Sequence, residues 1–231
     1  MAAKRSGVPD KRAQRKGERP QPVDEPQGEP TLSRDRIVAT AIDLLDAHGL
    51  DGLTMRRLAD RLGSGVMSLY WHVDSKEDVF DLALDAVLEY RGPPEADESR
   101  DWRADIVHML EDWRASMLRH PWSAALLPRQ ALGPNVLARL ELLGETLSRA
   151  GVADADLNVA IWSLWNTLMG ATITRASFDL SDEERAAAQQ RLARLGERHP
   201  TIERSRLLLD DDWDGVFRKG LGVLLDGLSP R

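Results

Sequence analysis

Residues 53–73, which read LTMRRLADRLGSGVMSLYWHV, determine how the rest of the chain is interpreted. The first half of this stretch predicts a short helix. Leu58 and Leu62 lie four residues apart and therefore share one face, which is suited to packing inward. Thr54 precedes them and can accept a hydrogen bond from an otherwise unpaired N–H of the first turn. We expect the helix to begin just after Thr54.

A sharp turn and a second helix follow. Gly63 and Gly65 enclose one serine, and glycine tolerates the positive φ that a tight interhelical turn requires. Residues 66–72 predict a helix of two turns, with Leu69 and Val73 directed inward. So short a helix is not stable alone, because nucleation costs more than its few hydrogen bonds return. The pattern predicts a helix-turn-helix, whose second helix is presented to the DNA major groove.

The aromatic segment at residues 69–73 has a second interpretation, as an ordinary strip of core side chains. The sequence around it favours the helix-turn-helix. Ser75, followed three residues later by Asp78, forms a capping box that predicts the start of a further helix. Helix, glycine-bracketed turn, short helix and capped helix therefore occur in the order that a DNA-binding unit requires.

Residues 33–88 resemble the DNA-binding domain of the tetracycline-repressor (TetR) family. The resemblance rests on LTMRRLADRLG (53–63), SLYWHV (68–73) and the continuation DVFDLAL (78–84). The segment FRKGLGVLLDGL (217–228) more weakly resembles the last helix of the family's tetracycline-repressor-like branch. The resemblance implies an all-α homodimeric transcriptional regulator, and a repressor that a small molecule releases from its operator DNA.

Helical periodicity and chain breakers predict an all-α fold in three parts. Residues 1–30 contain five prolines and few large apolar side chains, and are expected to form a disordered basic leader. Residues 31–91 are expected to form the helix-turn-helix DNA-binding domain, a three-helix bundle plus a connecting fourth helix that ends before Gly92-Pro93-Pro94. Residues 92–231 are expected to form a larger helical effector-binding and dimerisation domain. The leader is interpreted either as a solvated tail or as an arm that follows DNA phosphates.

Composition excludes several classes of protein. The chain has 31 basic and 38 acidic residues, a net charge of −7, so any DNA contact must come from a local patch rather than from overall charge. The absence of cysteine excludes disulfides and cysteine-based zinc sites. No signal peptide or membrane-spanning run occurs, which predicts a cytoplasmic protein without membrane contact. No catalytic or nucleotide-binding motif is found, so we expect neither an enzyme nor a cofactor.

The predicted DNA contacts come from two lines of reasoning. The start of the second helix carries the base-facing positions Gly65, Val66, Met67 and Ser68, while Arg56 is the best candidate for a bidentate guanine contact. A lysine in the first turn of a helix opposes the helix dipole unless a phosphate binds there, which favours a contact from Lys76. The resemblance implies contacts, mostly to phosphates, from Thr54, Arg56, Ser68, Tyr70, Trp71, His72 and Lys76.

Four of the seven tryptophans, at positions 113, 122, 162 and 165, gather in the segments 113–127 and 154–178, which predicts a pocket between helices. The predicted effector-binding residues are Met109, Trp113, Met117, Trp122, Trp162, Trp165, Asn166 and Met169. The asparagine is expected to be buried among them, and the alternative is that the whole set is plain core. Tetracycline-binding members of the family hold a magnesium–drug chelate with histidines and an asparagine. The aligned positions here are Gly92, Met109 and Leu127, so the resemblance implies no metal and no release by tetracycline.

Residues 154–178 are apolar around most of the helix, so a second subunit is expected to cover part of that surface. The last helix carries a leucine stripe with glycines beside it. The predicted dimer interface consists of Ile161, Leu164, Leu168, Leu221, Leu224, Leu225 and Leu228. The alternative is that this stripe packs only on the core of its own subunit.

Two other functions compete with a ligand-released repressor. One is a helical small-molecule-binding protein or enzyme in which the N-terminal helices only pack. The other is a DNA-binding protein without an effector. The sequence identifies neither the effector nor the operator.

Overall fold

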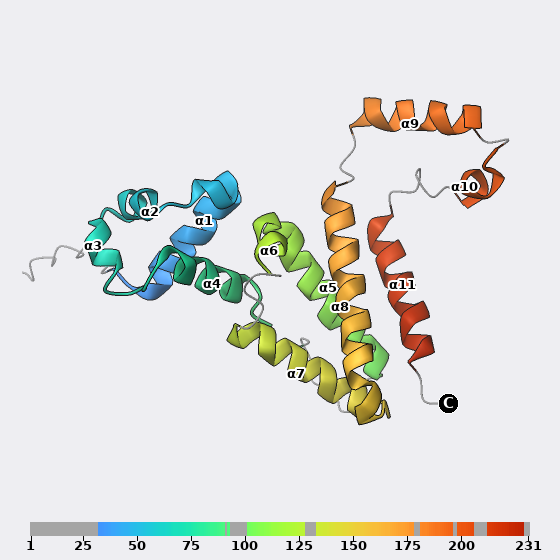
Figure 1. Ribbon diagram of the computed structural model, residues 1–231, viewed down its shortest axis with the longest axis horizontal. Helices are drawn as coiled ribbons and strands as arrows, with labels where there is room; N and C mark the ends of the chain where they lie inside the picture. Colours follow the sequence, from blue (N-terminus) through green and yellow to red (C-terminus); the bar gives the residue numbers. More distant parts are fainter. Residues whose placement is uncertain are drawn as a thin grey trace, which may run out of the picture. The chain divides into compact units, whose positions relative to one another are not determined.

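The computed structural model describes residues 32–90, 92, 101–127, 133–177, 181–195, 198–205 and 212–228, and every regular element in these ranges is a helix (Figure 1). The predicted leader lies outside the described residues. The helices are α1 (Arg34–Gly52), α2 (Met55–Leu62), α3 (Val66–Leu69), α4 (Lys76–Val87), α5 (Trp102–Arg119), α6 (Pro121–Leu126), α7 (Pro134–Arg149), α8 (Asp154–Ser177), α9 (Asp182–Leu195), α10 (Pro200–Ser205) and α11 (Trp213–Gly227). The all-α prediction is confirmed.

Side-chain caps start three of the first four helices, and those at Thr54 and Ser75 are where the sequence predicts them. Ser33, Thr54 and Ser75 accept hydrogen bonds from the backbone N–H three residues further on, at 3.3, 3.1 and 3.0 Å. Each bond satisfies a donor that the first helical turn leaves unpaired. At α4 the box is nearly reciprocal, because the Asp78 carboxylate accepts from the N–H of Asp74 at 3.0 Å.

The first four helices share one apolar core. α1 packs against α2 and α4, and α2 packs against α3. Ile37, Leu58, Leu69 and Val79, one from each helix, are fully buried. Leu69 therefore fixes α3, which at four residues is too short to be stable without its neighbours.

Two helix ends depart from regular geometry. α1 continues past Gly49, which has φ 65° and ψ −170° and produces a kink, and one more turn reaches Gly52. α4 ends at Val87, before Gly92 as expected. The carbonyls of the residues that follow Val87 bind an arginine of α7 instead of continuing the helix.

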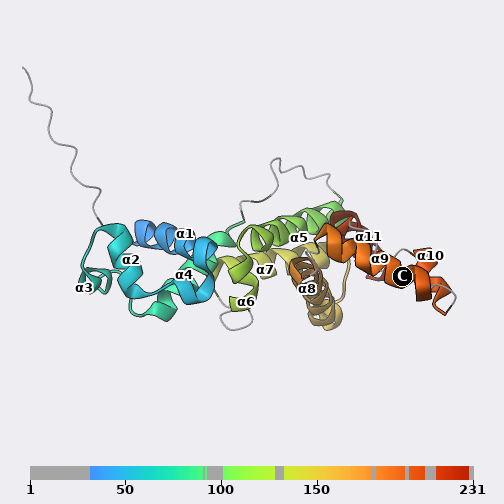
Figure 2. The ribbon, with the colours of Figure 1, turned by 90° about the horizontal axis from the view of Figure 1, so that it is seen from above.

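The later helices pack around α5 and α8. α5 contacts α6, α7, α8 and α11, and α11 runs along α8 (Figure 1). The view from above shows α11 beside α5 as well (Figure 2). Ile106, Trp113, Leu164 and Leu221 are completely buried where these helices meet.

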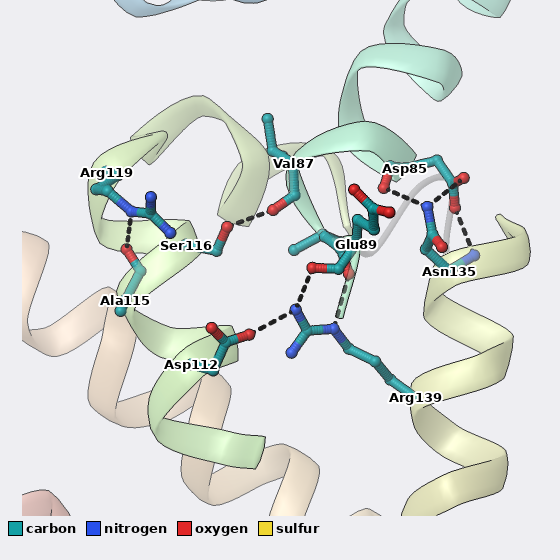
Figure 3. Close-up of polar contacts among 10 residues, drawn as sticks. Asp85, Val87, Glu89, Asp112, Ala115, Ser116, Arg119, Asn135 and Arg139 are labelled. Atoms are coloured by element: carbon teal, nitrogen blue, oxygen red, sulfur yellow. Dashed lines mark hydrogen bonds and ion pairs between the residues drawn. The ribbon is translucent and has the colours of Figure 1, made fainter. Parts of the chain in front are cut away.

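A buried arginine joins the end of α4 to α5 and α7 (Figure 3). The Arg139 Nε atom donates to the carbonyl of Leu88 at 2.7 Å, and Nη2 donates to the carbonyl of Glu89 at 3.0 Å. Nη2 also meets the Asp112 carboxylate at 2.8 Å. The guanidinium lies 4.8 Å from the ring centre of Tyr90. Burial lowers the pKa of Arg139, and the hydrogen bond and charge of Asp112 oppose that shift.

Two further contacts strengthen this connection (Figure 3). The Asp85 carboxylate of α4 accepts from the N–H of Asn135 at 2.8 Å and from its Nδ2 at 2.9 Å, and so caps the start of α7. The Ser116 hydroxyl of α5 donates to the carbonyl of Val87. We refer to Asp85, Val87, Leu88, Glu89, Asp112, Ser116, Asn135 and Arg139 as the junction.

A separate contact joins α1 to α6. The Asp46 carboxylate lies 2.8 Å from His120 Nδ1 and accepts from Trp122 Nε1 at 2.7 Å. The first four helices are thus held to the later ones at two independent places, although the domain boundary near residue 92 remains a prediction.

We predict that Arg139→Ala lowers the free energy of unfolding by about 3 kcal/mol, because Asp112 and two carbonyls lose their shared donor inside the protein. Arg218→Ala is the control, since Arg218 forms an ion pair with Glu111 and its side chain is 63% exposed. Its loss is expected to cost less than about 1 kcal/mol. Urea unfolding followed by circular dichroism measures both, and equal losses would contradict the structural role assigned to Arg139.

Candidate nucleic-acid interface and ligand hollow

The turn between α2 and α3 has the geometry of a helix-turn-helix. Gly63 ends α2 with φ 65° and ψ 29°, a left-handed conformation that disfavours other residues. The N–H of Ser64 donates to the carbonyl of Ala59 at 3.0 Å, which closes the turn. Gly65 then starts α3 in an extended conformation, with φ −76° and ψ 146°.

The second helix is shorter than predicted, because α3 ends at Leu69 and residues 70–72 form a turn. The segment 66–73 nevertheless turns one side inward and the other to solvent. Leu69 and Val73 are buried, whereas Met67 is 75% exposed and Trp71 is 87% exposed. Tyr70 is also exposed. A tryptophan so exposed costs free energy in water, which points to a surface that another molecule covers. All ten predicted DNA contacts are at least partly open to solvent in the structure.

The two neighbouring arginines of α2 differ in what they bind. Arg57 Nη1 donates to the carbonyl of Gly52 at 3.1 Å, so this side chain fixes α2 to the end of α1. Arg56 forms no hydrogen bond or ion pair with the described residues, and its side chain is exposed. The guanidinium N–H groups of Arg56 are therefore available to a binding partner such as DNA.

Lys76 lies in the first turn of α4, with its Nζ atom 5.0 Å from the ring centre of Phe80. Three acidic residues surround this turn. The pKa of Asp81 is raised by burial and then by the negative charges of Asp78 and Glu77. The cluster therefore favours a cation nearby, and Lys76 supplies one.

The residues predicted to bind an effector separate into two groups. Met109, Trp113, Met117, Trp122 and Met169 are buried core side chains. Trp162 and Asn166 lie on the exposed side of α8. The expectation that Asn166 is buried was wrong, because its side chain is exposed to solvent.

A hollow of about 760 Å³ lies between α7 and α8. It contains two of the predicted effector residues, Trp162 and Trp165, whose ring centres are 6.4 Å apart and whose planes meet at 85°. The complete lining is Leu137, Ala138, Leu140, Glu141, Ile161, Trp162 and Trp165. Sequence reasoning missed the four residues of α7 and assigned Ile161 to the dimer interface. A second hollow of about 520 Å³ adjoins it and shares Leu140, Glu141 and Ile161.

Four of the seven residues expected at the dimer interface are buried inside their own chain, whereas Ile161, Leu224 and Leu228 are only partly buried. The four buried residues are Leu164, Leu168, Leu221 and Leu225. The reason is that the leucine stripe of α11 packs inward on α5 and α8. The apolar residues that α8 and α11 leave exposed are Val159, Trp162, Ile173, Val216 and Val223.

Within the described ranges, no three acidic or histidine side chains gather in a way that could hold a metal ion. The same part of the chain contains no helix with the length and apolar character of a membrane span. What the arrangement offers chemically is an exposed, donor-bearing surface on α2–α4 and a largely apolar hollow on α7–α8.

Family models match both parts of the chain. Residues 37–83 match the model described as bacterial regulatory proteins, tetR family. Residues 93–231 match the model described as tetracyclin repressor-like, C-terminal domain.

Individual relatives agree with these matches. An HTH-type transcriptional regulator of Saccharopolyspora erythraea is 38% identical over 212 residues, which cover 90% of this chain and 89% of that protein. ActR of Streptomyces coelicolor in complex with actinorhodin has 31% identity and a TM-score of 0.73, covering 85% of this chain and 95% of that one. BioQ with its double-stranded DNA operator has 27% identity and a TM-score of 0.61, covering 86% of this chain and 99% of that one.

We predict that Gly63→Ala destabilises the protein by about 1 kcal/mol, because alanine is strained at the φ of 65° found there. Gly65→Ala is the matched control, since its φ of −76° suits any residue and its added Cβ would lie 3.7 Å from Ser68 Oγ. That change is expected to stay within about 0.5 kcal/mol of the parent. Thermal unfolding distinguishes the two, and a larger loss for Gly65→Ala would contradict this description of the turn.

Proposed function

The chain belongs to the TetR family of transcriptional regulators, and we propose that it is a repressor that binds a palindromic operator as a homodimer and leaves it when a small molecule binds. Family membership makes the chain a regulator and not an enzyme. The observation that carries the proposal is the exposed surface of α3 and of the turn after it, with Met67 and Trp71 exposed and Leu69 buried in the core.

DNA binding follows from the chemistry of this surface. Arg56, with no described partner, offers the paired donors that recognise guanine in the major groove. Val66 and Met67 offer apolar contacts to thymine methyl groups, and Ser68 offers a hydroxyl. Tyr70 and Lys76 border the same surface and are proposed to bind phosphates, which position the protein without reading sequence.

A homodimer is supported by the surface that α8 and α11 leave open. Val216 and Val223 are 57% and 76% exposed and lie on one side of α11. Gly220 lies between them, and a Cβ added there would meet no atom within 4 Å. Valines and an open glycine allow a second backbone to approach closely, and two-fold pairing would place one helix-turn-helix on each half of a palindrome.

Effector binding is assigned to the hollow between α7 and α8. ActR, which has a similar fold, has been solved with the small molecule actinorhodin. Trp162 and Trp165 give the hollow an aromatic wall, and a volume of about 760 Å³ fits a drug-sized molecule. A DNA-binding protein without an effector would show no such ligand-dependent release.

Selection of bound sequences from random DNA tests the proposal, and the selected operator is then used to test individual contacts. The winning sequence is expected to be an inverted repeat with half-sites about 10 bp apart or a multiple of that spacing. On this operator, Arg56→Ala is predicted to relax discrimination at one base pair by about 1–3 kcal/mol. Tyr70→Phe and Lys76→Ala are predicted to weaken binding to all sequences alike, and Lys76→Ala to flatten the salt dependence.

Arg61→Ala is the control for Arg56→Ala, because it removes the same charge from an exposed position of α2. It is expected to lower overall affinity slightly and to leave base preference unchanged. An Arg56→Ala variant that keeps the parent's preference at every position would refute the assignment.

We predict that Val216→Glu combined with Val223→Glu yields monomers in sedimentation analysis, with helicity retained and operator binding lost. The paired carboxylates would repel each other across a two-fold interface and leave apolar surface unburied. Leu221 and Leu225 are unsuitable for this test, since both are buried and their replacement would unfold the chain. Ala47→Glu on the exposed side of α1 is the control and is expected to remain dimeric. Persistent dimers of the double variant would move the interface to another surface.

A further inference from the structure

The hollow between α7 and α8 has an unusual balance of apolar and charged groups. Six of its seven lining residues are apolar, and the seventh is Glu141. A carboxylate beside apolar surface is costly to desolvate unless a positive group or a donor meets it. A molecule that fills the hollow must therefore satisfy Glu141 as well as cover the apolar wall.

No described residue neutralises Glu141. It forms no hydrogen bond or ion pair within the described part of the chain, and no basic residue lines the hollow. The basic side chain closest in sequence is Arg139, whose guanidinium is bound at the junction to Asp112 and to backbone carbonyls. The negative charge of Glu141 is therefore available to a ligand.

The aromatic wall, like Glu141, favours a positively charged ligand. The faces of indole rings attract cations, with a gain of roughly 0.5–2 kcal/mol that increases as water is excluded. Trp162 and Trp165 both line the hollow with their rings nearly perpendicular. Contact with Trp113, whose ring centre lies 5.2 Å from that of Trp165, holds the second ring in place.

We infer that the hollow selects an organic cation with an apolar, aromatic body. The apolar lining and the two indoles would cover the body, and Glu141 would pair with the positive centre. An anion of the same shape would be repelled by the Glu141 carboxylate. A neutral molecule would desolvate that carboxylate without supplying a partner for it. This inference rests on the proposed function, because it names the chemical class of the effector at that site.

Two probes of the same shape and opposite charge test the inference. Isothermal titration calorimetry with the full chain would compare tetraphenylphosphonium, a cation, with tetraphenylborate, an anion. We expect one saturable site per chain for the cation and weaker binding of the anion. Glu141→Gln, which keeps size and polarity, is expected to weaken cation binding about tenfold and to remove the preference between the probes.

Two further variants test whether the preference for the cation arises from Glu141 and from the indole of Trp162. Glu145→Gln is the matched control, because Glu145 lies one turn further along α7 and lines only the adjoining hollow. Its affinity for the cation is expected to stay within about twofold of the parent. Trp162→Leu keeps the wall apolar but removes an indole ring, and is expected to weaken binding of the cation more than binding of the anion.

Equal or tighter binding of tetraphenylborate would overturn the inference, as would a cation affinity that Glu141→Gln leaves unchanged. Cation binding seen only with the monomeric Val216→Glu, Val223→Glu variant would assign the hollow to a subunit contact and would also overturn it. Affinity for the selected operator is measured on the same preparations. A parent chain that binds its operator but shows no preference for the cation refutes the ligand class alone, whereas a parent chain that binds no DNA refutes the proposed function.

Discussion

The buried guanidinium of Arg139 is the interaction on which the junction between the first four helices and the later ones depends. Removing this charge from water is costly, and the cost is offset only because the surrounding groups are arranged for it. Arg139 donates to the carbonyls of Leu88 and Glu89, the two residues that follow α4, while Asp112 balances its charge. An arginine suits this position better than a lysine, since its fixed fork reaches several acceptors at once.

The same guanidinium lies at one end of a series of aromatic contacts. Its central carbon is 5.3 Å from the ring centre of Trp113, which contacts Trp165, which contacts Trp162. Trp162 lines the hollow, and the carbonyls that Arg139 binds belong to the end of α4. A molecule in the hollow would therefore contact the first of four packed side chains that end on the last helix of the DNA-binding region. Trp113 and Arg139 are buried within this series, whereas Trp162 is 57% exposed at its outer end.

Features that depend on nearby residues could be predicted from the sequence. The caps at Thr54 and Ser75, the turn at Gly63 and the inward direction of Leu69 are each specified within four residues, and the structure has all of them. Features that depend on how distant helices meet could not be predicted in this way. A helix that is apolar on most sides gives no local indication of which face packs inward, which explains the errors at Asn166 and Leu221. The hollow was missed for the same reason, because it exists only where α7 and α8 face each other. Arg139 did leave a signal, since it occupies the buried stripe formed by Val136 and Leu143.

The contact between α1 and α6 limits how this regulator can be recombined with its relatives. Asp46 is the shared acceptor for His120 and Trp122, and Asp85 caps α7 through Asn135. A chimera spliced near residue 92 would take each carboxylate from one parent and its donors from the other. A DNA-binding region transplanted from a relative is therefore compatible with the later helices of this chain only if it has acidic side chains at both positions, whatever DNA sequence it prefers.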